Sequence, residues 1–353
     1  MSGIDRTMVE TADESAPGGP QAARRGFDQP ALRVESLRKD FRHPWTQRVK
    51  TAVHEISFDV PQGGAFGLLG PNGAGKTTTL RMILGLLPAT RGRAWLLGRP
   101  AGTPESRTGV GFLPENPYFY DHLSAEEFLE YSGELAGLTR VAARAEGREL
   151  LERVGLGEVG RQRMRRYSKG MLQRAGLAHA LMARPRLLFL DEPMSGLDPI
   201  GRREVADVIR DLKRDGTTVI FSSHILHDVE TLCERVAILQ AGRLVAEGAL
   251  DTLLRKESGG AEVLVRPSGT LVLASEFLGV EIEPLGGLTR LTVRQPERLG
   301  PLVAWLVNQG HALASVTPER RSLEDLFLDM FRESHAVGGE PERVERTGKR
   351  AAP

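Results

Sequence analysis

Residues 65–77 read AFGLLGPNGAGKT, and this stretch decides how the rest of the chain is interpreted. Residues 65–69 form a continuous apolar run, which is typical of a strand buried on both faces of a parallel sheet. The glycine-rich segment 70–77 follows at once and leads into the helical pattern KTTTLRMILGLL. A strand, a glycine-rich turn and a helix in this order are the context that a P-loop requires. The stretch therefore predicts a phosphate-binding loop.

The residue types in this loop suit the phosphates of a nucleotide. Glycines allow successive backbone N–H groups to turn toward an anion at the positive end of the helix dipole. Lys76 would supply a positive charge to the β- and γ-phosphates, and the Thr77 hydroxyl would bind Mg²⁺. A turn that merely links strand to helix is the alternative, but the full spacing and both flanking elements argue against it. The expected contacts are Gly70, Pro71, Asn72, Gly73, Ala74, Gly75, Lys76, Thr77 and Thr78.

Two further apolar strands offer the other groups that hydrolysis of a nucleotide needs. RLLFLDEP ends in Asp191 and Glu192. Asp191 would hold Mg²⁺ through water, and Glu192 could accept a proton from the attacking water. Two acids after a strand can also begin an ordinary helix, but Pro193 argues against that here. TVIFSSH ends in His224, which could contact the γ-phosphate and orient the water, although a lone histidine is usually structural.

Strand-like runs alternate with helical patterns over most of the chain. VGFLP, RLLFL and TVIFSS resemble AFGLL in composition, and patterns such as SAEEFLEYSGEL and PIGRREVADVIRDLKRDG lie between them. Ser124 with Glu127 predicts a capping box. Asp198 and Pro199 predict the start of a later helix, and Gly216 suits the position just past its end. The alternation predicts an α/β domain with a mostly parallel core sheet.

Composition divides the chain into four parts. Residues 1–30 and the charged tail 336–353 are expected to be disordered. The α/β domain is expected at 31–258 and ends at the linker-like KESGGAEV. A small α+β accessory domain is expected at 259–335, with strand-like AEVLVRP, TLVLAS and LTRLTVR and helical ERLGPLVAWLVNQG and SLEDLFLDMFRE.

Charge and composition restrict the partners and the compartment. The chain has 47 Lys and Arg against 46 Asp and Glu, and 5% aromatic residues, so it lacks the footprint of a nucleic-acid-binding protein. Cys233 is the single cysteine, which rules out an internal disulfide and suits a reducing compartment. No apolar run reaches the roughly 20 residues that cross a bilayer, and we expect no signal peptide. A membrane function would need another chain to span the bilayer.

In this order, the motifs resemble those of the nucleotide-binding subunit of ABC transporters over roughly residues 31–250. GPNGAGKTT resembles the Walker A motif, LLFLDEP the Walker B motif, SGLDP the D-loop, and Ser223-His224 the switch histidine. The resemblance implies an α/β fold of the P-loop NTPase class, an ABC cassette. Such a cassette has a RecA-like core, an antiparallel β subdomain and a helical subdomain, here followed by the small α+β domain.

The resemblance also implies that two cassettes pair head to tail around two ATP molecules. YSKGM occupies the place of the signature motif, usually Leu-Ser-Gly-Gly-Gln, so Ser168 and Gly170 would bind the γ-phosphate held by the partner's P-loop. A simple helix cap is the alternative. Asp198 of the D-loop would join the nucleotide-binding residues. Phe41 falls where the family places an aromatic that stacks on adenine, and Trp45 is a weaker candidate. The implied unit is a homodimer, or a heterodimer with a similar chain.

The implied function is ATP-driven export. The chain would bind ATP and Mg²⁺ and hydrolyse ATP on the cytoplasmic face of the cell membrane, driving a separate integral-membrane permease. Export over import rests on YSKGM and the C-terminal extension. The region between Glu115 and Ser168 would form the helical subdomain that docks the permease. Tyr118, Phe119 and Tyr120 either make that contact or pack in the core.

The chain departs from the family pattern in three places: the Q-loop position, the signature, and the C-terminal domain, which the basic cassette does not need. Glu115 stands where the Q-loop usually has glutamine, and it could approach Mg²⁺ or the attacking water, or serve mainly as a link to the permease. Lys169 and Met171 alter the signature, but its serine and second glycine are kept. A soluble ABC-type ATPase acting on ribosomes or DNA is one alternative, disfavoured by the single cassette and the charge balance. A regulatory module that hydrolyses little is the other, and Glu115 leaves room for it.

Overall fold

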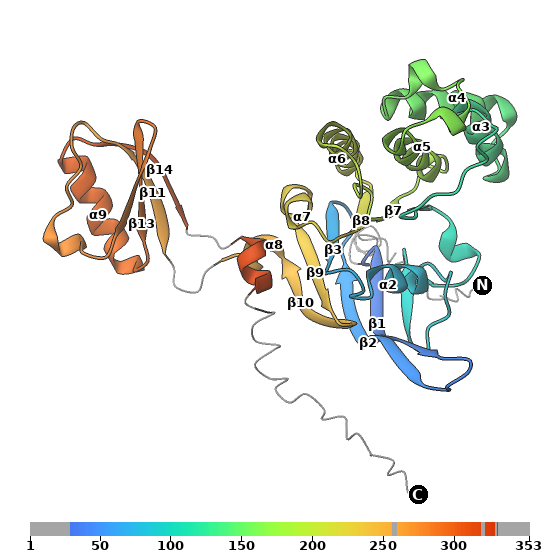
Figure 1. The fold of residues 1–353 in the computed structure, drawn as a ribbon, viewed down its shortest axis with the longest axis horizontal. Coiled ribbons are helices and arrows are strands. Elements are labelled where there is room, and N and C mark those ends of the chain that lie inside the picture. Colours follow the sequence, from blue (N-terminus) through green and yellow to red (C-terminus); the bar gives the residue numbers. More distant parts are fainter. Residues whose placement is uncertain (1–28, 256–259, 319–321, 329, 331–353) are drawn as a thin grey trace, which may run out of the picture.

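The computed structural model describes residues 29–255, 260–318, 322–328 and 330, and Figure 1 shows their arrangement. The first domain is built on a six-stranded sheet with the order β10-β9-β3-β8-β7-β6. The pairs formed by β3, β6, β7, β8 and β9 are parallel, and β10 pairs antiparallel with β9. The strands are β3 (Ala65–Leu69), β6 (Val110–Leu113), β7 (Leu187–Asp191), β8 (Thr218–Ser223), β9 (Arg235–Gln240) and β10 (Arg243–Ala249). The predicted parallel core sheet is confirmed.

Side chains of the central strands feed two hydrophobic cores, one on each face of the sheet. On β7, Leu188 and Leu190 join one core, whereas Leu187 and Phe189 join the other. This alternation follows from the two-residue period of a strand. All five residues of β7 are buried, which accounts for the unbroken apolar run in the sequence.

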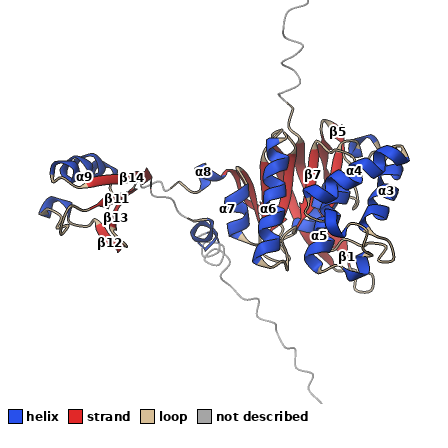
Figure 2. Ribbon diagram, turned by 90° about the horizontal axis from the view of Figure 1, so that it is seen from above, coloured by secondary structure: helices blue, strands red, loops and turns tan. Residues whose placement is uncertain are grey.

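Helices lie over one face of this sheet (Figure 2), and the helix Lys76–Ile83 packs in the core on the other face. The capping box is present, because the Ser124 hydroxyl accepts from the Glu127 backbone N–H and the Glu127 carboxylate accepts in return. Asp198 caps the later helix Pro199–Arg214 with Pro199 at its first position, and Gly216 follows its end with φ 86°. The helices are α2 (Lys76–Ile83), α3 (Ala125–Leu135), α4 (Arg140–Arg153), α5 (Lys169–Leu181), α6 (Pro199–Arg214), α7 (Leu226–Leu232) and α8 (Leu250–Leu253).

A second, four-stranded antiparallel sheet packs over α2 and shares its hydrophobic core with the central sheet. Its order is β2-β1-β4-β5, and the long hairpin of its first two strands pairs Phe41 with Lys50 near the tip. The hairpin extends beyond ALRVESL and AVHEISFDV, the two stretches whose alternation of apolar and polar residues predicts strands. The strands are β1 (Leu32–Arg42), β2 (Val49–Val60), β4 (Arg91–Leu96) and β5 (Arg99–Pro100).

The accessory domain is a separate four-stranded antiparallel sheet with one helix packed on it. TLVLAS, predicted as a strand, is irregular, because Leu271 and Leu273 pack on the domain's core without a strand partner. Two strands were not predicted, at 281–285 and 312–318. The elements are β11 (Ala261–Arg266), β12 (Glu281–Leu285), β13 (Leu288–Val293), α9 (Pro296–Asn308) and β14 (Ala312–Pro318).

The chain returns from the accessory domain to the first domain. Ala261 and Pro318 are partners across β11 and β14, so the chain enters and leaves the accessory sheet at adjacent points. Residues 323–328 are helical, and Leu323 and Leu326 are buried in the core of the first domain. Figure 1 shows this last helix, in red, beside α8. Residues 323–328 of SLEDLFLDMFRE, a stretch assigned by sequence to the accessory domain, therefore pack on the first domain instead. Within the described part of the chain, none of the helices combines the length and apolarity that a bilayer span requires.

Candidate functional site

The predicted P-loop lies between β3 and α2, as the sequence indicates. Gly75 caps the helix in a left-handed conformation, φ 102°, which is unfavourable for any residue with a Cβ atom. A Cβ atom on Gly70 would lie 2.3 Å from the Leu239 carbonyl oxygen. At Gly73, by contrast, no atom lies within 4 Å of an added Cβ, so the loop backbone is open on that side. Close packing shapes the base of the loop and leaves its turn accessible.

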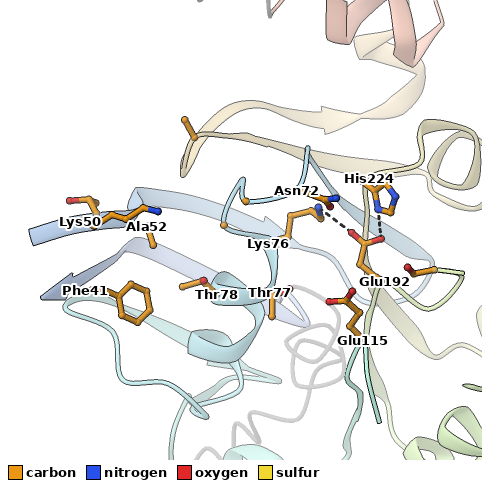
Figure 3. Close-up of a pocket in the computed structure, with 15 residues that line it drawn as sticks. Phe41, Lys50, Ala52, Asn72, Lys76, Thr77, Thr78, Glu115, Glu192 and His224 are labelled. Carbon is orange, nitrogen blue, oxygen red and sulfur yellow. Dashed lines mark hydrogen bonds and ion pairs between the residues drawn. The ribbon is translucent and has the colours of Figure 1, made fainter. Parts of the chain in front are cut away.

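Lys76, Glu192 and His224 form one chain of contacts beside the loop (Figure 3). The Lys76 ammonium lies 3.1 Å from Glu192 Oε1 and donates to the Gly70 carbonyl at 2.7 Å. His224 Nδ1 lies 2.8 Å from Glu192 Oε2. Both carboxylate oxygens are therefore engaged, one by each neighbour. Lys76 and Glu192 are only 5% and 8% exposed, so they interact in a medium where charges attract more strongly than in water.

The backbone at Glu192 is unusual. This residue has φ 50°, in the left-handed region that non-glycine residues rarely adopt. Such a conformation costs on the order of 1–3 kcal/mol and persists where the surroundings enforce it. The turn directs the Glu192 side chain away from the end of β7 toward the P-loop.

Asp191 lies at the end of β7 and is 2% exposed. Its Oδ1 accepts hydrogen bonds from the Thr77 hydroxyl at 3.2 Å and from the Ser222 hydroxyl at 2.6 Å. Thr77 and Asp191 therefore meet although 114 residues separate them in sequence. A hydroxyl and a carboxylate side by side are hard oxygen donors of the kind that Mg²⁺ takes beside nucleotide phosphates. This donor set fits the metal that the sequence analysis expects.

Lys76, Thr77 and Glu192 border a pocket of about 1000 Å³, whereas Asp191 lies behind Thr77 and does not line it. Phe41, Glu115 and His224 all line it, with most of the accessible loop residues. Glu115 makes no hydrogen bond or ion pair with the described residues and faces the same space as Glu192 (Figure 3). Four lining residues were not predicted from the sequence, Lys50, Thr51, Ala52 and Ala241, and Ser195 was predicted only as part of the D-loop. Lys50 lies opposite Phe41 across the β1–β2 hairpin, a register that the sequence does not give.

Other predicted residues lie outside this pocket. Ser168 caps α5, accepting from the Met171 N–H at 3.2 Å, and Asp198 caps α6, accepting from the Gly201 N–H at 2.9 Å. Gly170 lies in the first turn of α5. Trp45, the weaker candidate for adenine, is 90% exposed at the tip of the β1–β2 hairpin and does not line the pocket. Within one chain, the observed contacts of Ser168 and Asp198 are those of helix caps.

Tyr167, the residue before Ser168 of the signature motif, is fixed by burial and by a hydrogen bond. Tyr167 donates its hydroxyl to the Val159 carbonyl at 2.8 Å, and burial raises the pKa of that hydroxyl above its ordinary value. The phenol therefore remains neutral and fixed. It anchors the turn from which Ser168 and the N-terminus of α5 project.

Comparison with known proteins identifies the family. A sequence profile described as ABC transporter matches residues 53–195. An uncharacterized ABC transporter ATP-binding protein of Synechocystis is 42% identical over 299 residues, which are 82% of this chain and 81% of the relative. The chain belongs to the ABC transporter ATP-binding proteins. Its first domain is the ABC cassette, a P-loop fold that binds nucleotide, with the antiparallel and helical parts that the sequence analysis expected.

Two further relatives agree with this assignment. The linearmycin resistance ATP-binding protein LnrL of Bacillus subtilis is 35% identical over 313 residues, covering 85% of this chain and 97% of the relative. A solved structure of an ATP-binding subunit of an ABC transporter is 31% identical, with a TM-score of 0.56, and the match covers 63% of this chain and 91% of that one. The chain is thus an ATP-binding subunit of a transporter.

Proposed function

We propose that this chain hydrolyses ATP to drive export through a separate integral-membrane permease, from the cytoplasmic face of the cell membrane. The observation that carries the proposal is the contact chain Lys76–Glu192–His224 beside the P-loop, in a pocket that also holds Phe41. The resistance function in the name of the LnrL relative supports export as the direction.

Each side chain has a role that its position supports. Lys76 would bind the β- and γ-phosphates, and Phe41, 43% exposed on the pocket wall, would stack on adenine. The Glu192 carboxylate accepts a proton as the water oxygen bonds to the γ-phosphorus and the bridging P–O bond to ADP breaks. His224 holds the second oxygen of Glu192 and so orients the base. Together these groups perform phosphoryl transfer to water.

The metal would be held by Thr77 and Asp191, whose oxygens already lie 3.2 Å apart. When bound, Mg²⁺ neutralises charge on the β- and γ-phosphate oxygens. Glu115 lines the same pocket, and we assign it as a further oxygen donor to the metal or the attacking water. A carboxylate at this position brings a negative charge toward the phosphates, which glutamine would not.

The active unit would be a dimer. Ser168 and Gly170 lie outside the pocket of their own chain, yet Ser168 is exposed at the N-terminus of α5, where backbone N–H groups attract anions. We assign both residues, with Asp198, to the ATP held by the P-loop of a second cassette. The second cassette is another copy of this chain or a similar chain.

The permease would dock on the helical subdomain. Tyr118 is 98% exposed and Tyr120 is 54% exposed, while Phe119 packs on the core. Tyr131 on α3 stacks edge-on against Tyr120 and is also half exposed. Aromatic side chains of this kind are enriched in protein interfaces. The three tyrosines form the proposed contact.

Turnover of the complex with its permease tests the hydrolysis proposal. We expect Glu192→Gln to lower kcat by about 10²–10⁴-fold while ATP still binds, because the base is lost and the phosphate contacts remain. Lys76→Ala should lose ATP binding itself. Equal rates for wild type and Glu192→Gln, both near background, would refute the enzyme proposal.

Dimer closure is tested in the Glu192→Gln background, where bound ATP is not turned over. ATP should convert this variant from monomer to dimer in size-exclusion chromatography. Adding Ser168→Ala should prevent the shift without weakening ATP binding to the monomer. Thr139→Ala is the matched control, because Thr139 caps α4 in the same manner and has no assigned phosphate contact. If the two cap variants dimerise equally, Ser168 is only a helix cap.

The permease is tested by affinity purification of the tagged chain from native membranes in mild detergent. A stoichiometric protein with several membrane spans supports the transport proposal. Copurification of ribosomes or nucleic acid in its place would contradict it and leave the ATP chemistry unaffected.

A further inference from the structure

Ser222 occupies a central position between the two acidic residues of the site. It lies on β8 with 0% exposure, directly opposite Asp191 in the parallel pairing of β7 with β8. Its hydroxyl donates to Asp191 Oδ1 at 2.6 Å and accepts from the Glu192 backbone N–H at 2.9 Å. One hydroxyl thus bridges Asp191, the last residue of β7, and Glu192, the residue after it.

The direction of these two hydrogen bonds is fixed by chemistry. A backbone N–H can only donate, so the Ser222 oxygen must accept from Glu192. A serine hydroxyl has one hydrogen, and that hydrogen is therefore committed to Asp191. Across the described residues, both hydrogen bonds to the Asp191 carboxylate end on Oδ1, one from Ser222 and one from Thr77. This arrangement leaves Oδ2 for another ligand.

The second bond acts on the backbone. Glu192 has φ 50°, and its N–H points back to Ser222 instead of continuing the strand pairing. Without that acceptor the buried N–H would lack a partner, which costs on the order of 1–3 kcal/mol. The Ser222 hydroxyl therefore helps to hold the turn that carries Glu192 toward Lys76.

We propose that Ser222 is a positioning residue that sets the Asp191 carboxylate for the metal of bound Mg·ATP and holds the backbone of Glu192. The proposal rests on the function proposed above. Hydroxyl partners that orient a metal-binding carboxylate typically change metal affinity or activity by about 10- to 100-fold when removed. The neighbouring Ser223 does not share this role, because its hydroxyl bonds to the backbone of Ile225.

The test uses Mn²⁺ as a spectroscopic substitute for Mg²⁺. Electron paramagnetic resonance measures the binding of Mn²⁺ to the full chain in the presence of a non-hydrolysable ATP analogue. We expect Ser222→Ala to weaken the Mn²⁺ Kd by about 10- to 100-fold. Binding of the analogue without metal should stay unchanged. ATPase assays should show a lower kcat and a higher half-saturating Mg²⁺ concentration, with the KM for ATP unchanged at saturating metal.

Three variants separate positioning from general damage. Ser222→Thr retains a hydroxyl and should restore the Mn²⁺ Kd to within about threefold. Ser222→Cys nearly preserves the side-chain volume but is a weak hydrogen-bond donor, so it provides the test if Ser222→Ala does not fold. Ser132→Ala removes a buried hydroxyl whose one hydrogen bond among the described residues goes to the Phe128 carbonyl, within α3, and should leave the Kd unchanged.

The outcomes distinguish this inference from the function on which it rests. If wild type binds Mn²⁺ with the analogue and folded Ser222→Ala or Ser222→Cys binds it equally well, the positioning role is refuted. If wild type itself shows no saturable Mn²⁺ site with the analogue, the proposed ATP hydrolysis is refuted instead.

Discussion

The last helix offers a quantitative test of the domain assignment. Leu326 is 2% exposed and belongs to the hydrophobic core of the cassette, although its sequence follows the accessory domain. Leu326→Ala should therefore destabilise the cassette, not the accessory sheet. Truncation of a buried leucine to alanine costs about 2–5 kcal/mol. At about 2–4 °C per kcal/mol for a domain of this size, a loss of about 3 kcal/mol lowers the Tm by about 6–12 °C.

The assay is thermal unfolding of the full chain followed by circular dichroism, with and without ADP. Ligand binding raises the transition of the domain that binds it, so ADP identifies the cassette's transition. Leu328→Ala is the matched control, because Leu328 lies two residues further on and is 49% exposed. We expect that control to shift the Tm by less than about 2 °C. If Leu326→Ala lowers only the transition that ADP does not move, the helix belongs to the accessory domain and the reasoning fails.

Three other residues give direct predictions. Burial raises the pKa of the Cys233 thiol well above its ordinary value, so native protein should resist maleimide at about pH 7 and unfolded protein should react at once. Burial lowers the pKa of the His179 imidazole below 6.5, so the unfolded chain binds a proton first and stability is lost as pH falls below 6.5. His179→Leu should reduce the drop in Tm between about pH 7 and about pH 5. Ser124→Ala removes the capping box of α3 and should cost about 1 kcal/mol in denaturant unfolding.

Much of the site could be predicted because its residues follow short, local patterns. The P-loop needs its glycines, Lys76 and Thr77 at fixed spacing between one strand and one helix. Asp191, Glu192 and His224 follow buried strands, and carboxyl ends of parallel strands meet at one edge of a sheet. The sheet pairing then brings Asp191 beside Thr77 and Glu192 beside Lys76.

The features that escaped prediction depend on register or on distant packing. Lys50 reaches the pocket only because β1 and β2 pair Phe41 with it, and the tip of a hairpin does not reveal that register. The sequence places Ser222 in an apolar strand but does not show that it lies opposite Asp191 of β7. The final helix shows an amphipathic pattern, but a pattern states which face is apolar and not which core receives it. TLVLAS is apolar enough for a strand, yet Leu271 and Leu273 pack on the accessory core from an irregular segment while Val272 is exposed.

The return of the chain to the cassette affects the order in which the protein can fold during synthesis. The ribosome makes the cassette's strands first, then residues 261–318 of the accessory domain, and only then Leu323 and Leu326. Domains generally fold as units in the order in which they emerge. Here the cassette's core receives its last side chains after the accessory domain has left the ribosome. A nascent chain released early would lack the two leucines that complete the hydrophobic core to which Leu250 and Leu254 also belong. Translation to the end of this helix is therefore a requirement for a complete cassette.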